Sequence, residues 1–434
     1  MKKFKSIVSK LMLGSLLLSS LTATAVSAQE EETEVYGSGD KVLEIWSFTN
    51  EINTMIEDYY LMDHPDLGYK IEIVNIPTAE FEAKLDPIFG TDAAPDLILL
   101  EQNFVKKYVE SGLLADLSQF ENVITGSENT LEYVTGIGTN KDGVYYANSW
   151  QSAPGAFFYR HSMAEELLGI TDPAEMQAKI SDWDGFIETA REIKEASNGE
   201  VYMISGVDDL RFAYLGTREQ GWVVDGELVI DPKMEELLET ALLMNEEGLM
   251  LDAPPESEAY YGGMSGDEIF GYSLPSWGLH FWLKPNGGEA TQGDWRMVEG
   301  PSAYFRGGTW LGVTANSDML SEASDLMTYI TTDADFQTQW AQDTGDIVSN
   351  TNVVEAIKGE YSDEFLGGQN HYAAFADMVG NIKGEIITEY DQAVNVLFVD
   401  HALTPYSKGE VDKETAISNF KAQVQNSFPN IVIN

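Results

Sequence analysis

Residues 42–117 alternate between short segments of strand character and segments of helical periodicity, and this alternation restricts the possible folds more than any other feature of the chain. Runs of β-branched, aromatic and aliphatic residues predict strands at 42–48, 69–73 and 95–100. Apolar residues at helical spacing predict helices at 52–62, 77–88 and 104–109. This order predicts a parallel sheet with helices on both faces. Ligands of such sheets bind beyond the carboxyl ends of the strands.

The rest of the chain also alternates between predicted strands and helices, with a larger share of helix. A chain of 434 residues is longer than a domain with one hydrophobic core usually is, which favours two domains or two lobes. The Asp225-Gly226 pair predicts a hairpin across 222–230, and Asp231-Pro232 predicts the start of a helix. The glycine-rich run 307–313 predicts a return strand. Residues 372–426 are expected to be mostly helical.

The N-terminus has the three-part sequence pattern of a secretory signal peptide. Lysines precede an apolar run that begins at Leu11, and Ala25 to Ala28 has a small-x-small pattern typical of a cleavage site. We therefore expect residues 1–28 to be a signal peptide. Residues 29–40, which open with consecutive glutamates and end near Gly37 and Gly39, are expected to form a solvated acidic linker.

Composition excludes several classes of function. The chain carries 25 Lys and Arg against 72 Asp and Glu, a net charge of −47, and such a chain repels phosphate backbones and anionic lipid heads. We therefore expect no nucleic-acid partner. There is no cysteine, which removes disulfides, thiolate metal sites, cysteine nucleophiles and lipid attachment to an N-terminal cysteine.

The sequence contains no recognisable set of catalytic residues. None of the five histidines pairs at the spacing of a metal-binding helix, and there is no nucleophile elbow or Walker loop. Two carboxylate pairs, Asp343 with Asp346 and Asp208 with Asp209, have the residue types that glycoside hydrolysis needs. With so many acids, chance adjacency explains such pairs better. The sequence therefore predicts a protein that is not an enzyme and that has no cofactor and no metal site.

Four of the nine tryptophans, Trp46, Trp150, Trp277 and Trp310, lie at predicted strand ends or beside glycine-rich turns. Sugars offer flat C–H faces and a ring of hydroxyls, which suit indole faces and planar polar side chains. Core packing is the alternative role for each of these four residues.

Several segments together carry a family resemblance. Residues 95–117, PDLILLEQNFVKKYVESGLLADL, are similar to the PD-hydrophobic…GLL-x-DL segment of family 1 extracellular solute-binding proteins, the sugar-binding components of ABC importers. In the same order, Lys41 to Phe48 resembles the opening strand of that family, KDGVYYA at 141–147 its G-x-x-Y-A segment, and SDWDGF at 181–186 its TWDEF segment. Pro275 to Gly278 and the run 307–313 are similar to its G-x-W and return-strand segments. The resemblance spans nearly the whole mature chain, although Asn148 and Arg160 replace the usual Pro and Asn.

The resemblance implies an α/β, two-lobe type II periplasmic-binding-protein fold with hinge crossings and a ligand cleft between the lobes. It implies that lobe one comprises 41–149 and 304–350, and lobe two 150–303 and 351–434. By matching position, the cleft candidates on lobe one, at the crossings and on lobe two are Trp46, Asn50, Glu51, Glu101, Gln102, Asn103, Trp150, Gln151, Ser152, Asp209, Arg211, Trp277, Trp282, Gly308 and Trp310.

The expected function is that of an extracytoplasmic, monomeric protein that captures a mono- or oligosaccharide and delivers it to ABC transporter permease subunits. Without a lipid-bearing cysteine it is expected in a periplasm, or at the cell surface or secreted. A secreted glycoside hydrolase or lyase, or a binding protein for a cationic ligand such as a polyamine or peptide, remain the alternatives. A cleft ringed by carboxylates would favour the cationic ligand.

Overall fold

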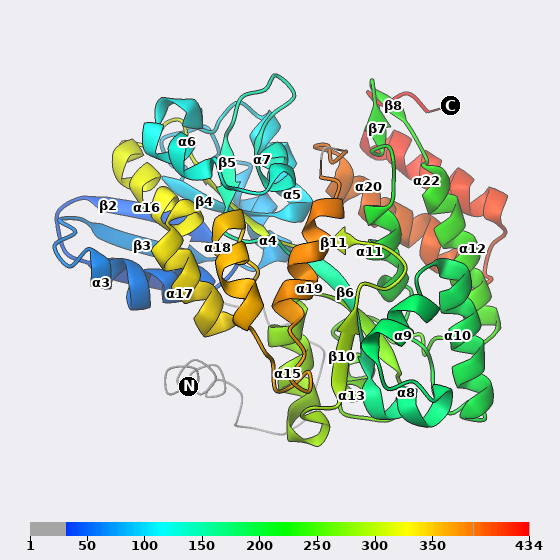
Figure 1. The fold of residues 1–434 in the computed structure, drawn as a ribbon. Helices are drawn as coiled ribbons and strands as arrows, with labels where there is room; N and C mark the ends of the chain where they lie inside the picture. Colours follow the sequence, from blue (N-terminus) through cyan, green and yellow to red (C-terminus); the bar gives the residue numbers. More distant parts are fainter. Residues whose placement is uncertain (1–31, 385, 434) are drawn as a thin grey trace, which may run out of the picture.

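A computed structural model describes residues 32–384 and 386–433. The predicted signal peptide lies outside the described residues. Two α/β lobes stand side by side, each built on its own sheet, and the chain passes between them more than once (Figure 1). The two-lobe fold expected from the sequence is therefore confirmed. Within the described ranges, no helix combines the length and apolar character that crossing a bilayer requires.

The sheet of lobe one has six strands in the order β1-β3-β2-β4-β12-β5. The strands are β1 (Glu32–Gly37), β2 (Val42–Ser47), β3 (Lys70–Asn75), β4 (Leu97–Glu101), β5 (Ala147–Ser149) and β12 (Thr309–Val313). β2, β3 and β4 are parallel as predicted, and the return strand β12 is inserted antiparallel between β4 and β5. The sheet is thus mixed, because β12 enters it from the opposite lobe.

A strand occupies half of the expected linker at 29–40. Glu32–Gly37 form β1, which pairs antiparallel with β3 along its whole length at the edge of the sheet. Its side chains are almost all exposed, so the segment lacks the apolar alternation that identifies a half-buried strand.

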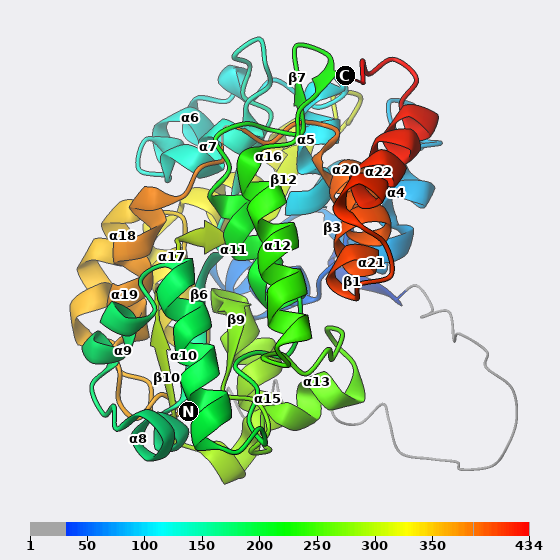
Figure 2. The ribbon, with the colours of Figure 1, turned by 90° about the vertical axis from the view of Figure 1, so that its right-hand side faces the viewer.

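Helices cover both faces of the lobe-one sheet (Figures 1 and 2). The principal ones are α2 (Glu51–Met55), α3 (Leu61–Asp63), α4 (Thr78–Leu85), α5 (Gln102–Glu110), α6 (Glu121–Ser127), α7 (Glu132–Gly138), α16 (Leu320–Thr332) and α17 (Ala334–Thr344). α18 (Thr351–Ile357) follows α17 after the third segment that joins the lobes. α2 and α3 are joined by the π-helical turn η1 (Ile56–Tyr60). The predicted helices after β2, β3 and β4 are confirmed, and α5 starts directly at the end of β4.

The sheet of lobe two is built around β6 (Pro154–Arg160). Its partners are β9 (Gly271–Pro275), β10 (Trp295–Val298) and β11 (Tyr304–Phe305), and β7 (Val223–Val224) with β8 (Glu227–Leu228) forms the predicted hairpin. The helices include α8 (His161–Leu168), α9 (Pro173–Lys179), α10 (Trp183–Ala196), α11 (Asp208–Gly216), α12 (Pro232–Glu246), α13 (Glu258–Gly263), α14 (Ser276–Gly278), α15 (Lys284–Gly287), α19 (His371–Met378), α20 (Asp391–Phe398), α21 (Thr404–Ser407) and α22 (Lys413–Ser427). Between α14 and α15 lies the π-helical turn η3 (Leu279–Leu283).

Three segments cross between the lobes. The first joins β5 to β6, the second joins β11 to β12, and the third follows α17, where the Ser152 amide donates to the Ile347 carbonyl and the Ser349 amide to the Trp150 carbonyl. Because β11 pairs with β6, Tyr304–Phe305 belong to lobe two, and the second crossing begins after Phe305 rather than before residue 304. The other lobe boundaries remain a proposal, which the sheet membership of the strands supports.

Candidate functional site

The carboxyl ends of β2, β4 and β5 and the amino end of β12 meet at one edge of the lobe-one sheet. Glu101 at the end of β4 is paired with Thr309 at the start of β12, and Trp310 is paired with Ser149 at the end of β5. Since the segments that follow these strand ends include two of the crossings, this edge faces lobe two. We call this boundary between the lobes the interlobe junction.

Lobe two brings its own strand ends to the same junction. In the second sheet, Pro275 is paired with Gly155 and Phe305 with Pro154, so that the residues after β9 and β11 lie at one edge. The backbone links the lobes here, because the amide of Gly307 donates to the Gln102 Oε1 atom over 2.6 Å. The junction is therefore formed by residues far apart in sequence.

At the junction, a guanidinium group lies over three aromatic rings. The Arg306 Cζ atom is 4.1 Å from the ring centroid of Phe212, 5.0 Å from Trp282 and 6.0 Å from Trp277. The indoles of Trp277 and Trp282 meet edge to face at 4.8 Å, and Trp277 Nε1 donates to the Arg306 carbonyl over 2.8 Å. We call these four residues the Arg306 cluster.

The backbone of Arg306 is hydrogen-bonded, but its guanidinium is not. Among the described residues, its guanidinium makes no hydrogen bond and no ion pair, and the side chain is only half-buried. A guanidinium carries five N–H donors in a planar fork. The three rings contact the group without using these donors, which are therefore available to a ligand.

Glu101 adds a carboxyl group near Arg306. It caps the start of α5, where its Oε2 atom accepts from the amide of Asn103 over 2.8 Å. Burial raises the pKa of Glu101 to about 7, although the Asn103 hydrogen bonds and the charge of Arg306 oppose that rise. The group can therefore be an acceptor or a donor near neutral pH.

A second pair of carboxyl groups, Glu51 and Asp346, lies near the first and third crossings. The Asp346 Oδ2 atom accepts from two indole nitrogens, Nε1 of Trp150 and Nε1 of Trp340, each over 3.2 Å. The carboxyl group of Glu51, the first residue of α2, accepts from the hydroxyl of Thr49. Burial and then repulsion by Asp346 raise the pKa of Glu51, and burial also raises the pKa of Asp346.

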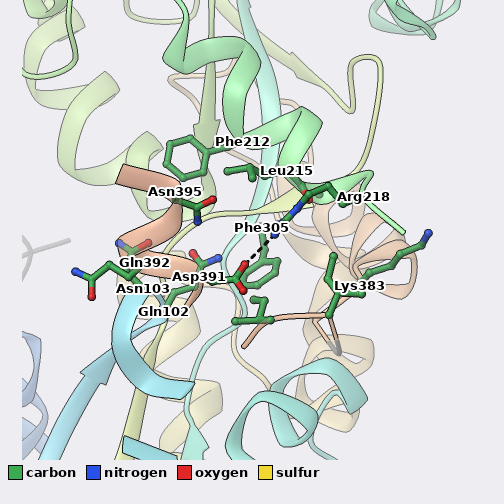
Figure 3. Close-up of a pocket in the computed structure, with 13 residues that line it drawn as sticks. Gln102, Asn103, Phe212, Leu215, Arg218, Phe305, Lys383, Asp391, Gln392 and Asn395 are labelled. Atoms are coloured by element: carbon green, nitrogen blue, oxygen red, sulfur yellow. Dashed lines mark hydrogen bonds and ion pairs between the residues drawn. The ribbon is translucent and has the colours of Figure 1, made fainter. Parts of the chain in front are cut away.

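A small pocket lies beside the Arg306 cluster, between α5 of lobe one and α11 and α20 of lobe two (Figure 3). Its volume is about 40 Å³, which suits a few water molecules and is too small for a sugar ring. In its wall, Arg218 Nη2 pairs with Asp391 Oδ2 over 3.0 Å, and both side chains are buried (Figure 3). As it stands, this pocket therefore cannot hold a ligand of sugar size.

Most of the residues expected from the sequence do reach the junction. Those at or directly beside it are Asn50, Glu51, Glu101, Gln102, Asn103, Trp150, Gln151, Ser152, Arg211, Trp277, Trp282 and Gly308. Gly308 has φ 107°, and a Cβ atom there would lie 3.0 Å from the Trp310 ring, so glycine is required at this position. Arg211 is tied to Asp208 by a 2.7 Å hydrogen bond.

Three of the expected residues take other places. Trp46 packs edge to face against Phe81 of α4, and its Nε1 atom donates to Glu44 of the same strand. The Trp310 side chain is 1% exposed in the lobe-one core and donates to the Val134 carbonyl, so it presents no free face. Asp209 is also buried, and it joins α11 to β9 by accepting from the amides of Ser205 and Ser273.

Sequence reasoning missed Arg306, Phe212 and Asp346 as members of the site. Arg306 could have been found from its position, because it directly precedes the Gly307-Gly308 pair of the return-strand motif. Phe212 and Asp346 carry no such signal, since a phenylalanine in a helix and one acid among many are ordinary. Among the described residues, no group of three or more His, Asp or Glu side chains could hold a metal ion.

Two α/β lobes joined by crossing segments, with aromatic and polar side chains at their junction, define the class of two-lobe binding proteins. Residues 60–365 match the family of bacterial extracellular solute-binding proteins, and the chain belongs to that family. A lactose-binding protein of Rhizobium radiobacter is 24% identical over 381 residues, which cover 82% of this chain and 86% of that protein.

Solved structures share the fold. An extracellular solute-binding protein of family 1 is 18% identical with a TM-score of 0.76, and the match covers 89% of this chain and 100% of that one. An ABC transporter-associated binding protein of B. animalis subsp. lactis Bl-04, solved with β-1,6-galactobiose, is 18% identical with a TM-score of 0.71 over 91% and 99% of the two chains. The resemblance found in the sequence is thus confirmed.

Proposed function

We propose that this protein captures a mono- or oligosaccharide at the interlobe junction and delivers it to an ABC transporter permease. The observation that supports this most is the Arg306 cluster. Its half-buried indoles suit the C–H faces of a sugar ring, and the unpaired guanidinium suits adjacent hydroxyls. The sugar-binding relatives, one of them described as lactose-binding, favour the same class of ligand.

The magnitude of these interactions is sufficient for capture. Each aromatic stack contributes about 0.5–1.5 kcal/mol beyond area burial, and each hydrogen bond to a charged group contributes about 1.5–3 kcal/mol. Two stacks and a few such hydrogen bonds therefore give a dissociation constant in the micromolar range. No bond of the ligand needs to break, and we propose that the protein has no enzymatic activity.

Binding requires a hinge motion in this proposal. The space now enclosed beside the cluster is about 40 Å³, so the lobes open at the crossings to admit a sugar and close over it. Contacts that form only after closure favour the closed state, and a permease would recognise that state. The proposal includes secretion directed by residues 1–28, an extracytoplasmic location and a monomeric binding protein.

A screen of mono- and oligosaccharides by thermal shift and calorimetry tests this function. A sugar at one hundred times its dissociation constant should stabilise the protein by about 2.7 kcal/mol. Binding that is lost in Arg306→Ala, but retained in an exposed control such as Arg191→Ala, would support the assigned site. If neither stability nor heat responds to any saccharide, the proposed function is wrong.

A further inference from the structure

The small pocket beside the Arg306 cluster reverses the charge balance of the chain. The sequence has 72 Asp and Glu against 25 Lys and Arg, yet the pocket is lined by two basic side chains, Arg218 and Lys383, and by one acidic side chain, Asp391. Helices α5 and α20 also begin at this pocket, and the amino end of a helix favours negative charge. These charges favour an anion over a cation.

One nitrogen of Arg218 has no partner at this pocket. The residue is 4% exposed, its Nη2 atom pairs with Asp391 over 3.0 Å, and its Nε atom donates to the Leu215 carbonyl. That ion pair stabilises the fold without using the Nη1 atom, which is buried and has no hydrogen-bond partner among the described residues. Asp391 is already engaged, because its other oxygen accepts from the amide and the hydroxyl of Thr388. An acceptor in the pocket would recover the free energy that an unsatisfied buried donor costs.

Two amide side chains in the lining, one from each lobe, have their oxygens engaged elsewhere. The Oε1 atom of Gln102 in α5 accepts from the amide of Gly307 over 2.6 Å, and the Oδ1 atom of Asn395 in α20 accepts from Nε1 of Trp222 over 2.5 Å. Their NH₂ groups make no hydrogen bond to the described residues, so these are the groups that the two amides can offer to the pocket. The apolar part of the lining is Phe212, Leu215, Phe305, Ile386 and Ile387.

The volume of the pocket restricts the size of the anion. A volume of about 40 Å³ holds a few water molecules, and a chloride ion is only slightly larger than one water molecule. An organic anion of the size of gluconate is too large.

We infer that this pocket binds a monatomic anion of the size of chloride, which accepts from Nη1 of Arg218 and from the amides of Gln102 and Asn395. Gln102 belongs to lobe one, whereas Arg218 and Asn395 belong to lobe two, so the anion joins the two lobes. It should therefore favour the closed form, and the anion and the sugar should each raise the affinity for the other. This coupling rests on the proposed sugar-binding function, whereas the anion site does not.

Bromide is the probe for the site, because it has the charge of chloride and nearly its size, and its anomalous scattering locates it in a crystal. Crystals grown with sodium bromide should hold one bromide in the pocket, within hydrogen-bond distance of Arg218 Nη1. In solution, the protein should broaden the nuclear magnetic resonance line of chloride, and added bromide should reverse the broadening. If the crystals show only water in the pocket, the inference is wrong.

Variants in both lobes test which groups hold the anion. Gln102→Glu and Asn395→Asp each keep the accepting oxygen and replace the NH₂ donor by a charged oxygen, so each should weaken anion binding about tenfold or more. Gln339→Glu is the matched control, because it adds the same charge to an exposed side chain of α17 that does not line the pocket. It should bind chloride as the parent does. If both pocket variants also bind chloride as the parent does, the inference is wrong.

The coupling is measured with a saccharide that calorimetry has shown to bind. Its affinity should be about fivefold or more higher in sodium chloride than in sodium gluconate at equal ionic strength. Equal affinities would contradict the joining of the lobes by the anion and leave the sugar-binding function intact. If bromide occupies the pocket and no saccharide binds, the proposed function fails while the anion site stands.

Discussion

Two arginines at the interlobe junction have opposite surroundings. Arg218, at the pocket between α11 and α20, is buried, pairs with Asp391 and donates to the Leu215 carbonyl over 3.2 Å. Arg306, in the second crossing, lies over three aromatic rings and has no acceptor among the described residues. The guanidinium of Arg218 stabilises the fold, whereas the guanidinium of Arg306 is positioned by the fold and can bind a ligand.

The comparison distinguishes a charge that stabilises the fold from a charge that can bind a ligand, although both lie at the same junction. A buried ion pair whose partner is removed leaves an uncompensated charge, so its loss reduces stability. A half-buried guanidinium that only contacts aromatic rings leaves no buried charge unpaired when it is removed, so its loss mainly affects what it binds. The same reasoning distinguishes Asp209, whose oxygens accept from three donors, from Asp346, which keeps a free oxygen.

The largest effect is expected at the paired arginine. Arg218→Ala leaves Asp391 buried without its counterion and should lower the free energy of unfolding by about 3–5 kcal/mol. Urea unfolding measures this loss. The double variant Arg218→Ala with Asp391→Ala should regain part of the stability. If Arg218→Ala is as stable as the parent protein, Arg218 does not stabilise the fold and the proposed difference from Arg306 is wrong.

Arg306→Ala should reduce ligand affinity and leave stability almost unchanged. We expect sugar affinity to fall about a hundredfold, or about 2.7 kcal/mol, because two hydrogen bonds from a charged donor are lost. Stability should change by less than about 1 kcal/mol, since the guanidinium has no hydrogen-bond or ion-pair partner among the described residues. Calorimetry and urea unfolding on the same preparation give both values, and Arg191→Ala serves as the exposed control.

Trp277→Ala should weaken sugar binding about tenfold without unfolding the chain, because one stacking face is removed while the fold keeps its core. Phe281→Ala is the matched control, since Phe281 lies one residue before Trp282 and is 53% exposed. Unchanged affinity in calorimetry for Trp277→Ala would exclude this indole from the site.

The smallest effect is expected at the carboxyl pair. Because burial and Asp346 raise the pKa of Glu51 above its unfolded value of 4.5, its stabilising contribution is complete below that pH and is lost as the pH rises through the folded pKa. Glu51→Gln removes this loss and should be about 1 kcal/mol more stable than the parent at pH 9. The two proteins should converge near pH 4.5 in urea unfolding, and a constant difference across this range would contradict the raised pKa.

Much of lobe one could be predicted from the sequence because its signals are local. The alternation at 42–110 predicted β2, β3, β4 and the helices between them within a few residues, and Asp225-Gly226 predicted the β7–β8 hairpin. β1 was missed because its exposed, mostly polar side chains lack the pattern of a buried face. The order of β12 between β4 and β5 could not be predicted, since strand pairing depends on contacts between distant segments.

The site was predictable only in part for the same reason. Tryptophans beside glycine-rich turns looked alike in the sequence, yet Trp277 is half-buried at the junction and Trp310 is inside the core. Which of them offers a free face depends on the helices that cover each sheet.

By itself, the sequence determined the α/β class, the two-lobe family and the chain segments that approach the ligand, because hydrophobic periodicity and motif order are written along the chain. Only the tertiary structure decided that the Arg306 guanidinium has no acceptor among the described residues, that one Asp346 oxygen has no partner there, that Trp46 packs on Phe81 and that Trp310 lies in the core. These properties arise from neighbours that are distant in the sequence, such as Trp150 and Asp346, whose packing sets the burial and pairing of each polar group.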